Sequence, residues 1–180
     1  MATQMIGGNP AQARSSTDFY PTPAEVTQAL LDFLKIPQGA VIWEPACGEN
    51  DMVRVLRAAG YGVTATDLIY GQDFLAEPHR DCDWIITNPP FSVSDKFIER
   101  CAASGKPFAL LLKSQYWHAK KRCDLFKKIT PKYVLPLTWR PDFLFKVHEK
   151  KSAPLMDVMW CVWEPPYNQK TIFEPLERPK

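Results

Sequence analysis

The feature that most constrains the fold of this chain is a set of short, mostly apolar runs that alternate with helical patterns. The apolar residues stand at consecutive positions rather than at every second one. The runs cover residues 40–43, 62–66, 84–87, 108–112, 133–137 and 156–163. Strands that are apolar on both faces are typical of a parallel sheet with helices on both sides. We therefore expect an α/β fold with a mainly parallel sheet.

Amphipathic helices are predicted between these runs, because apolar residues recur there at spacings of three and four. The strongest patterns cover residues 23–34, 51–59, 94–103 and 117–128. Thr22 is a candidate N-cap for the first helix, and Gly60 ends the second. The alternation of strands with helices supports the same α/β class.

The length of 180 residues suits one ordinary domain. Residues 1–16 show no hydrophobic periodicity and are predicted to form a flexible arm. Residues 17–163 are predicted to form the single domain. Residues 164–180 contain four prolines and are predicted to form an irregular tail.

The cysteines and the hydropathy pattern exclude several classes of protein. The five cysteines are widely scattered, form no C-x-x-C pair and lack zinc-site spacing, so no metal is expected. Their scatter suits a reducing compartment. No run of about 18 apolar residues indicates a membrane span, and no apolar N-terminal stretch indicates a signal peptide. We therefore expect a cytoplasmic protein without a membrane partner.

Polar residues follow three of the predicted strands at the point where each strand ends. These residues are Glu44, Asp67 and Asn88. The carboxyl ends of parallel strands meet at one edge of a sheet, and ligands bind in the crevice there. The three side chains are therefore expected to line one site.

The loop after the first strand, Glu44-Pro45-Ala46-Cys47-Gly48, has features of a nucleoside-cofactor site. Gly48 lets the backbone approach a ligand closely, and Asn50 tolerates the left-handed conformation. Asp67 is placed to accept hydrogen bonds from ribose hydroxyls. A dinucleotide is disfavoured because G-x-G-x-x-G is absent, and the acidic Glu44 suits an ammonium or sulfonium group better than a phosphate. Each residue alone has a structural alternative, in which it ends a strand or caps a turn.

The tetrapeptide Asn88-Pro89-Pro90-Phe91 suits catalysis on an exocyclic amine. Its two prolines make a rigid loop whose carbonyls are free to accept hydrogen bonds. Adenine N6 is a poor nucleophile, because its lone pair is delocalised into the ring. Bonds from N6 to the Asn88 oxygen and the Pro89 carbonyl would turn the nitrogen toward tetrahedral geometry, and Phe91 could stack on the base. Alone, the tetrapeptide is more often a strand terminator; its position after the cofactor-type loop favours catalysis.

Together these residues resemble the Rossmann-like S-adenosylmethionine-dependent amino-methyltransferases, and most closely the small phage and prophage DNA N6-adenine methyltransferases. The resemblance spans residues 17–163. Asp18-Phe19-Tyr20-Pro21-Thr22-Pro23 is similar to the N-terminal cofactor motif of that family, residues 44–48 to its methionine-binding motif, and residues 88–91 to its catalytic motif. Gly48-Glu49-Asn50 departs from the family pattern, since many relatives have a second glycine there.

The resemblance implies a fold, a cofactor and a reaction. The fold is a mainly parallel seven-stranded sheet with helices on both faces and an antiparallel last strand. The cofactor is S-adenosylmethionine, without a metal, and the reaction is methyl transfer to N6 of a DNA adenine that is flipped out of the helix. The implied catalytic residues are Asn88, Pro89, Pro90 and Phe91. The implied cofactor-binding residues are Tyr20, Pro21, Thr22, Glu44, Pro45, Cys47, Gly48, Asp67, Asp73 and Phe74.

The charge distribution points to a polyanionic partner. Residues 113–151 hold eleven basic and three acidic residues, a net charge of +8, whereas the rest of the chain holds eleven basic and seventeen acidic residues, a net charge of −6. Such asymmetry is typical of nucleic-acid binders, and residues 138–155 are the predicted target-contacting loop. The candidate substrate-binding residues are Trp117, His118, Lys120, Lys121, Arg122 and Arg140. The structural alternative is a solvated helix face with core aromatics.

Other functions stay open at this point. The same motif serves RNA methyltransferases acting on adenine N6 or guanine N2, and no residue identifies deoxyribose, so RNA is the main alternative partner. Protein-glutamine methyltransferases usually carry Tyr where Phe91 stands. Cytosine C5 methylation needs a nucleophilic Cys that the catalytic loop lacks. A nucleic-acid-binding module without activity is the remaining alternative, and the sequence gives neither the target motif nor the oligomeric state.

Overall fold

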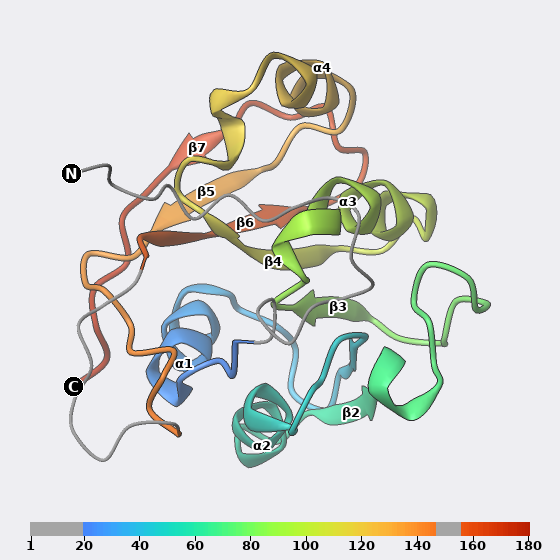
Figure 1. Cartoon of the computed structure of the whole chain (residues 1–180), viewed down its shortest axis with the longest axis vertical. Coiled ribbons are helices and arrows are strands. Elements are labelled where there is room, and N and C mark those ends of the chain that lie inside the picture. The colour runs from blue at the N-terminus through green and yellow to red at the C-terminus, as the bar shows by residue number, and fades with distance from the viewer. Residues whose placement is uncertain (1–19, 147–155) are drawn as a thin grey trace, which may run out of the picture.

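A seven-stranded sheet runs through the computed structural model, which describes residues 20–146 and 156–180 (Figure 1). The strands lie in the order β2-β1-β3-β4-β6-β5-β7. They are β1 (Val41–Glu44), β2 (Gly62–Ala65), β3 (Trp84–Thr87), β4 (Phe108–Lys113), β5 (Tyr133–Pro136), β6 (Val158–Trp163) and β7 (Ile172–Phe173). The predicted arm at residues 1–16 and residues 147–155 of the predicted target loop lie outside the described residues.

The helices agree with the predicted pattern except at one place. The α-helices are α1 (Ala24–Phe33), α2 (Asp51–Ala58), α3 (Ser94–Ala103) and α4 (Lys120–Lys128). The 3-10 helices are η1 (Leu68–Tyr70), η2 (Phe91–Val93) and η3 (Tyr116–His118). The helix predicted over 117–128 is divided into η3 and α4, because Ala119 between them has an extended backbone.

The sheet is mainly parallel, as predicted. β1 pairs in parallel with β2 and β3, and β3 pairs in parallel with β4. β6 is antiparallel to both of its neighbours, β4 and β5. The segment 164–180 differs from the expected irregular tail, since residues 172–173 form β7 beside β5 and Leu176 forms a bridge with Leu137.

Two hydrophobic layers cover the two faces of the sheet and explain the consecutive apolar runs. Ile42 of β1 packs with residues of α1 and α2, while its neighbour Trp43 packs with residues of α3 and α4. α1 and α2 accordingly lie on one side of the sheet and α3 and α4 on the other (Figure 1). Two buried indoles of β6 connect the sheet to these layers. Trp160 donates a hydrogen bond to the Val26 carbonyl, and Trp163 donates one to the Ile129 carbonyl.

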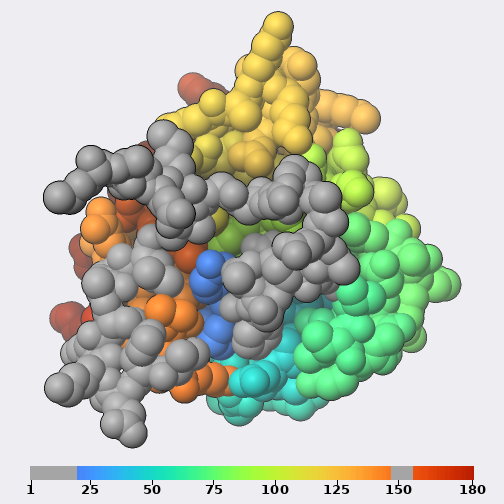
Figure 2. Space-filling view, viewed as in Figure 1, coloured from blue at the N-terminus to red at the C-terminus, as the bar shows by residue number. Residues whose placement is uncertain are grey.

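The carboxyl ends of β1, β3, β4 and β5 meet at one edge of the sheet. The first three strands are parallel, and β5 shares their direction because both β4 and β5 are antiparallel to β6. This edge therefore holds Glu44, Asn88 and Lys113, together with the segment that leaves β5. At one end of the molecule α4 projects, coloured yellow in Figure 2, well away from the teal and green segment that follows α2.

Candidate functional site

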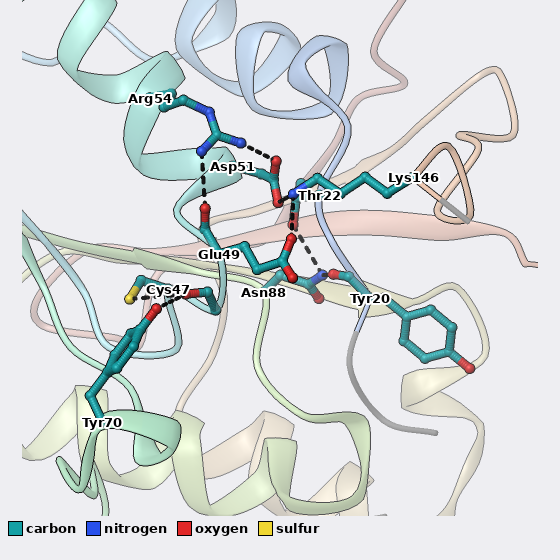
Figure 3. A network of polar contacts seen from close by, with 10 residues as sticks. Tyr20, Thr22, Cys47, Glu49, Asp51, Arg54, Tyr70, Asn88 and Lys146 are labelled. Atoms are coloured by element: carbon teal, nitrogen blue, oxygen red, sulfur yellow. Dashed lines mark hydrogen bonds and ion pairs between the residues drawn. The ribbon is translucent and has the colours of Figure 1, made fainter. Parts of the chain in front are cut away.

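The Asn88 side chain is held in one orientation at the end of β3. Its Nδ2 atom donates to the Tyr20 carbonyl and to Thr22 Oγ1, each at 3.1 Å (Figure 3). A carbonyl only accepts, so the amide nitrogen must face Tyr20 and the amide oxygen must face away. No donor from residues 20–146 or 156–180 reaches Asn88 Oδ1. Thr22 differs here from its expected role, because α1 has Pro23 as its N-cap and no side-chain cap bond.

The backbone after Asn88 leaves a second acceptor without a donor. The Pro90 carbonyl accepts from the Val93 N–H at 3.1 Å and from Ser94 Oγ at 3.3 Å, and the Phe91 carbonyl accepts from Ser94 Oγ. The Pro89 carbonyl accepts no hydrogen bond within the described chain. Asn88 Oδ1 and the Pro89 carbonyl are thus two neighbouring acceptors without a donor in the described chain, and Pro89 itself is buried. They are the two acceptors that the sequence hypothesis named.

Three aromatic rings and one cation surround this acceptor pair. The rings of Phe91 and Tyr20 have centroids 5.8 Å apart, and Tyr20 meets Phe143 edge-on at 6.2 Å. Lys113 Nζ lies 4.7 Å from the centroid of Phe91. Phe143 is 1% exposed. It belongs to the predicted target loop and was not among the predicted site residues, because nothing in the run Asp142-Phe143-Leu144-Phe145 indicates which distant residue Phe143 contacts.

The loop after β1 adopts the turn that a glycine-rich sequence would give. Gly48 has φ +48°, and Asn50 has φ 66° and ψ 26°, so Asn50 takes the left-handed conformation expected of it. The Asn50 N–H donates to the Cys47 carbonyl at 2.8 Å, which closes the turn. Asn50 therefore provides a left-handed backbone conformation that glycine adopts most readily.

Two residues that follow β2 hold this loop by hydrogen bonds. Asp67 accepts from the Gly48 N–H and from the Ile69 N–H, each at 2.9 Å. The Tyr70 hydroxyl donates to the Gly48 carbonyl at 3.0 Å (Figure 3). Each Asp67 oxygen takes one of these bonds and keeps a lone pair for another donor. The sequence did not point to Tyr70, which bonds to the loop from 22 residues away.

Glu44 lies behind the loop rather than on its surface. The side chain is 1% exposed, and its Oε1 atom accepts from the Ala46 N–H at 2.9 Å and from the Thr87 hydroxyl at 2.5 Å. Burial raises the pKa of Glu44 to about 8, and the negative charge of Asp67 acts in the same direction against the two hydrogen bonds. A cation bound nearby would favour the ionised form of this carboxyl group.

The other residues of the loop are enclosed. Pro45 and Cys47 are both buried. Burial, with the nearby charges of Glu44 and Asp67, raises the pKa of the Cys47 thiol to about 11. A thiol in this state is a poor nucleophile at neutral pH.

Phe74 has a different environment from the predicted one. Its ring is 3% exposed and packs against Trp43 at 5.0 Å and Phe97 at 4.8 Å. The side chain is therefore part of the core on the α3 side, and its position gives no support to a contact with the cofactor adenine. Asp73 accepts from the Leu75 N–H at 3.0 Å and so shapes the turn there. Pro21 is buried between the two residues that hold Asn88.

A cluster of charges joins the predicted target loop to the cofactor-type loop. Lys146 Nζ lies 2.8 Å from Glu49 Oε2 and 2.6 Å from Asp51 Oδ2 (Figure 3). Arg54 pairs with Asp51 and donates to the Glu49 carbonyl. The segment that leaves β5 thus crosses the carboxyl edge, touching Tyr20 through Phe143 and the start of α2 through Lys146.

The candidate substrate residues of η3 and α4 fall into two groups. His118, Lys120 and Lys121 are exposed, and Lys121 lies 3.6 Å from Asp95. By contrast, Arg122 donates to the Tyr116 carbonyl at 3.0 Å and lies over the Tyr116 ring at 4.2 Å. These contacts make Arg122 a structural residue of the η3–α4 corner.

Two further candidates also have partners within the protein. The Trp117 ring meets Tyr116 and Phe126 edge-on at 4.7 and 5.0 Å and flanks the core on the α3 side. Its position is that of a packing aromatic, which corrects the expectation that it is available to a base. Arg140 pairs with Asp157 at 2.7 Å on the surface. The exposed lysines are the better candidates for contact with a polyanion.

Metal-binding clusters and membrane-spanning helices are absent from the described residues. Residues 20–146 and 156–180 hold no group of three or more His, Cys, Asp or Glu side chains arranged to bind a metal ion. None of the helices in these ranges combines the length and the hydropathy of a membrane-spanning segment.

Three solved structures with a similar fold are remote from this chain in sequence. No protein-family description and no curated protein matches the chain. A methyltransferase subunit of the type I restriction-modification system of Streptococcus thermophilus has a TM-score of 0.57 and 12% identity, over 87% of this chain and 47% of that protein. A Listeria monocytogenes protein assigned to the class I S-adenosylmethionine-dependent methyltransferases has a TM-score of 0.55 and 16% identity, over 84% and 62% of the two chains. An S-adenosylmethionine-dependent O-methyltransferase of Thermotoga maritima has a TM-score of 0.52 and 13% identity, over 78% and 65%.

These likenesses show the fold. The chain has the Rossmann-like fold of S-adenosylmethionine-dependent methyltransferases, with the mainly parallel seven-stranded sheet that was expected. The chain spans only about half to two thirds of the length of these proteins. Because the three proteins include an O-methyltransferase and a restriction-modification subunit, the fold alone does not give the substrate.

Proposed function

We propose that this protein transfers a methyl group from S-adenosylmethionine to N6 of adenine in DNA. The observation that carries the proposal is the pair of neighbouring acceptors, Asn88 Oδ1 and the Pro89 carbonyl. Both are left without a donor by the described chain, while the Asn88 amide nitrogen and the next two carbonyls are engaged. An exocyclic amine has two N–H donors, one for each acceptor.

The acceptor pair suits the chemistry of an amine nucleophile. Two bonds from N6 to fixed acceptors draw its lone pair out of conjugation and aim it in one direction. Positive charge develops on N6 as the new C–N bond forms. The negative ends of the amide and carbonyl dipoles lie close to that charge and stabilise it. Tyr20 and Thr22 fix the Asn88 amide in advance, so little reorganisation is needed during the reaction.

The residues at the end of β1 fit the proposed cofactor. S-adenosylmethionine carries an electrophilic methyl group on a cationic sulfonium, together with an ammonium group and a ribose. The loop offers the Asp67 carboxylate, the buried Glu44 carboxyl group, whose ionised form a bound cation would favour, and a backbone turned to positive φ at Gly48 and Asn50. Acidic groups favour cationic ligands, and Asp67 retains acceptor capacity for a ribose hydroxyl. The residues that would hold the cofactor are therefore Gly48 and Asp67, with the buried Glu44 carboxyl group behind them.

DNA as the substrate is supported by charge and by one structural relative. The basic segment 113–151 has a net charge of +8, and its exposed lysines stand on α4 beside the carboxyl edge. One of the structural relatives is a methyltransferase subunit of a restriction-modification system. An adenine within a duplex must leave the base stack to reach the acceptor pair.

The test is a methyl-transfer assay with labelled S-adenosylmethionine on unmethylated DNA and on RNA, followed by digestion to nucleosides and mass spectrometry. We expect label in N6-methyldeoxyadenosine, and loss of the label with Asn88→Ala. Label confined to ribonucleosides would replace DNA by RNA as the substrate. No label in either nucleic acid would contradict the proposal.

A further inference from the structure

Lys113 is a cation in contact with the proposed catalytic motif, yet it has no acidic partner within the described chain. It is the last residue of β4, the strand that pairs in parallel with β3, and so lies at the carboxyl edge beside Asn88. Its side chain is exposed, and its Nζ atom lies 4.7 Å from the Phe91 centroid. No ion pair joins Lys113 to a carboxylate of residues 20–146 or 156–180.

Other cations of the same segment are engaged within the protein. Lys146 pairs with Glu49 and Asp51, Arg140 with Asp157 and Lys132 with Glu164. Arg122 is bound to the carbonyl and ring of Tyr116. Lys113 instead rests on an aromatic face, a contact that is weak when the lysine is exposed to solvent. Its ammonium group is therefore available to an anion at little cost.

The position over Phe91 makes this cation incompatible with a stacked base in the same place. The proposed reaction, on which this inference rests, requires the target base beside Phe91 and leaves positive charge on N6. An ammonium group on that ring face would block the base and repel the developing charge. The nearest anion that a bound nucleotide supplies is the phosphate on either side of the target base.

We propose that Lys113 is a substrate-positioning residue, whose ammonium group rests on Phe91 in the free protein and binds a phosphate flanking the target nucleotide when the base takes its place. The chemical class of the ligand is a nucleotide phosphodiester. The Phe91 ring face and the phosphate compete for the same Lys113 side chain. Binding of the base at Phe91 and binding of its phosphate by Lys113 are therefore coupled.

Lys35 provides a matched control. α1 runs from the contact between Thr22 and Asn88 back toward the start of β1, so Lys35, two residues after α1, lies toward the opposite edge of the sheet. Lys35 is also exposed. Lys35→Met removes the same charge with the same change of side-chain shape. Because Lys35 lies far from the proposed site, this variant reports only the effect of the protein's net charge.

The experiment measures methyl transfer to an oligonucleotide with one target adenine, for the wild type, Lys113→Met, Lys113→Arg and Lys35→Met. Each protein is tested on the normal strand and on strands with one uncharged methylphosphonate linkage on either side of that adenine. We expect Lys113→Met to lower kcat/KM about tenfold or more with unchanged affinity for S-adenosylmethionine, and Lys113→Arg to keep at least a third of the activity. One methylphosphonate linkage should lower kcat/KM of the wild type but cause no further loss of kcat/KM in Lys113→Met.

Two results would overturn the assignment to Lys113 while the proposed function stands. One is an effect of Lys113→Met no larger than that of Lys35→Met. The other is a full additional loss when the methylphosphonate and Lys113→Met are combined, since independent effects multiply. Absence of transfer by the wild type on DNA and RNA would instead overturn the proposed function, and this inference with it.

Discussion

The two sides of the carboxyl edge differ in how their charged residues are held. On the side of β1 and β2, the carboxylates of Glu44 and Asp67 are tied to backbone N–H groups and a hydroxyl, and they shape the loop that holds them. On the side of β4 and α4, lysines such as Lys113 and Lys120 are exposed and without carboxylate partners in the described chain. The first side is a fixed acidic cradle, and the second is an open basic surface.

This contrast indicates what each side can bind. A fixed cradle selects a small cationic ligand by shape and costs little reorganisation on binding. An open basic surface attracts a polyanion of any sequence and adapts to its backbone. Asn88 stands between the two sides, at the point where a small cofactor and a large substrate would meet. The four predictions that follow test this division, beginning with the residue on the boundary.

Asn88→Ala should lower the rate of methyl transfer about a thousandfold, because it removes an acceptor aimed at the reacting amine. The affinity for S-adenosylmethionine should change less than threefold, since the loop after β1 keeps all its own contacts. Calorimetry and a single-turnover assay give the two values. Thr22→Val is the matched control: it keeps Asn88 Oδ1 and removes one of two anchors, so the loss should be nearer tenfold. Equal losses for the two variants would mean that Asn88 acts through structure rather than as an acceptor.

Glu44→Gln should change how stability depends on pH. The pKa of Glu44 is raised by burial from 4.5 to about 8, so the folded protein holds this proton more tightly than the unfolded chain. Wild-type stability should therefore fall as pH rises from about 4.5 to about 8, by up to roughly 1.4 kcal/mol per pH unit from this group. The glutamine amide of the variant cannot ionise, so its free energy of unfolding should lack this fall.

Chemical denaturation at pH 5, 6, 7 and 8 measures the effect. The exposed carboxylate of Asp81 supplies the control, since Asp81→Asn should leave the wild-type slope in place. Parallel curves for wild type and Glu44→Gln would show that Glu44 is ionised across the whole range. The acidic cradle would then be open to solvent rather than enclosed.

The acidic cradle could be predicted from the sequence far better than the basic surface. The end of an apolar strand fixes where Glu44, Asp67 and Asn88 lie, and the left-handed tendency of Asn50 is a property of the residue itself. These features depend on the local chain. The sequence could therefore suggest the acceptor pair as a hypothesis from local residues alone.

Features that depend on distant contacts were missed or misread. Phe74 and Trp117 were expected at ligands but pack in the core, and Phe143 was missed because its partner Tyr20 is far away in the sequence. Arg122 stands next to Lys121 in α4, but it contacts Tyr116, whereas Lys121 is exposed. A basic or aromatic residue gives no sign of whether it faces a core or a ligand, so only the tertiary structure separates the two.

The basic surface should separate into structural and binding residues. Arg122→Met removes a hydrogen bond to the Tyr116 carbonyl and should lower the free energy of unfolding by about 1–2 kcal/mol. Lys120→Met with Lys121→Met should leave stability within about 0.5 kcal/mol. The double variant should reduce the slope of log K against log salt for duplex DNA by up to about 1.8. An unchanged slope would remove α4 from the substrate surface.

The smallest expected effect concerns Lys146, which links the two sides of the carboxyl edge. Lys146 reaches from the basic segment to Asp51, which is 10% exposed, and to Glu49, which is 59% exposed. Lys146→Met should weaken binding of S-adenosylmethionine about two- to fivefold, because partly exposed ion pairs are weak. Double-mutant cycles with Asp51→Asn and Glu49→Gln, followed by calorimetry, locate the effect. Coupling should be larger with Asp51, where solvent screens the charges less. Zero coupling in both cycles would mean that the acidic cradle holds its shape alone and that the two sides of the edge act independently.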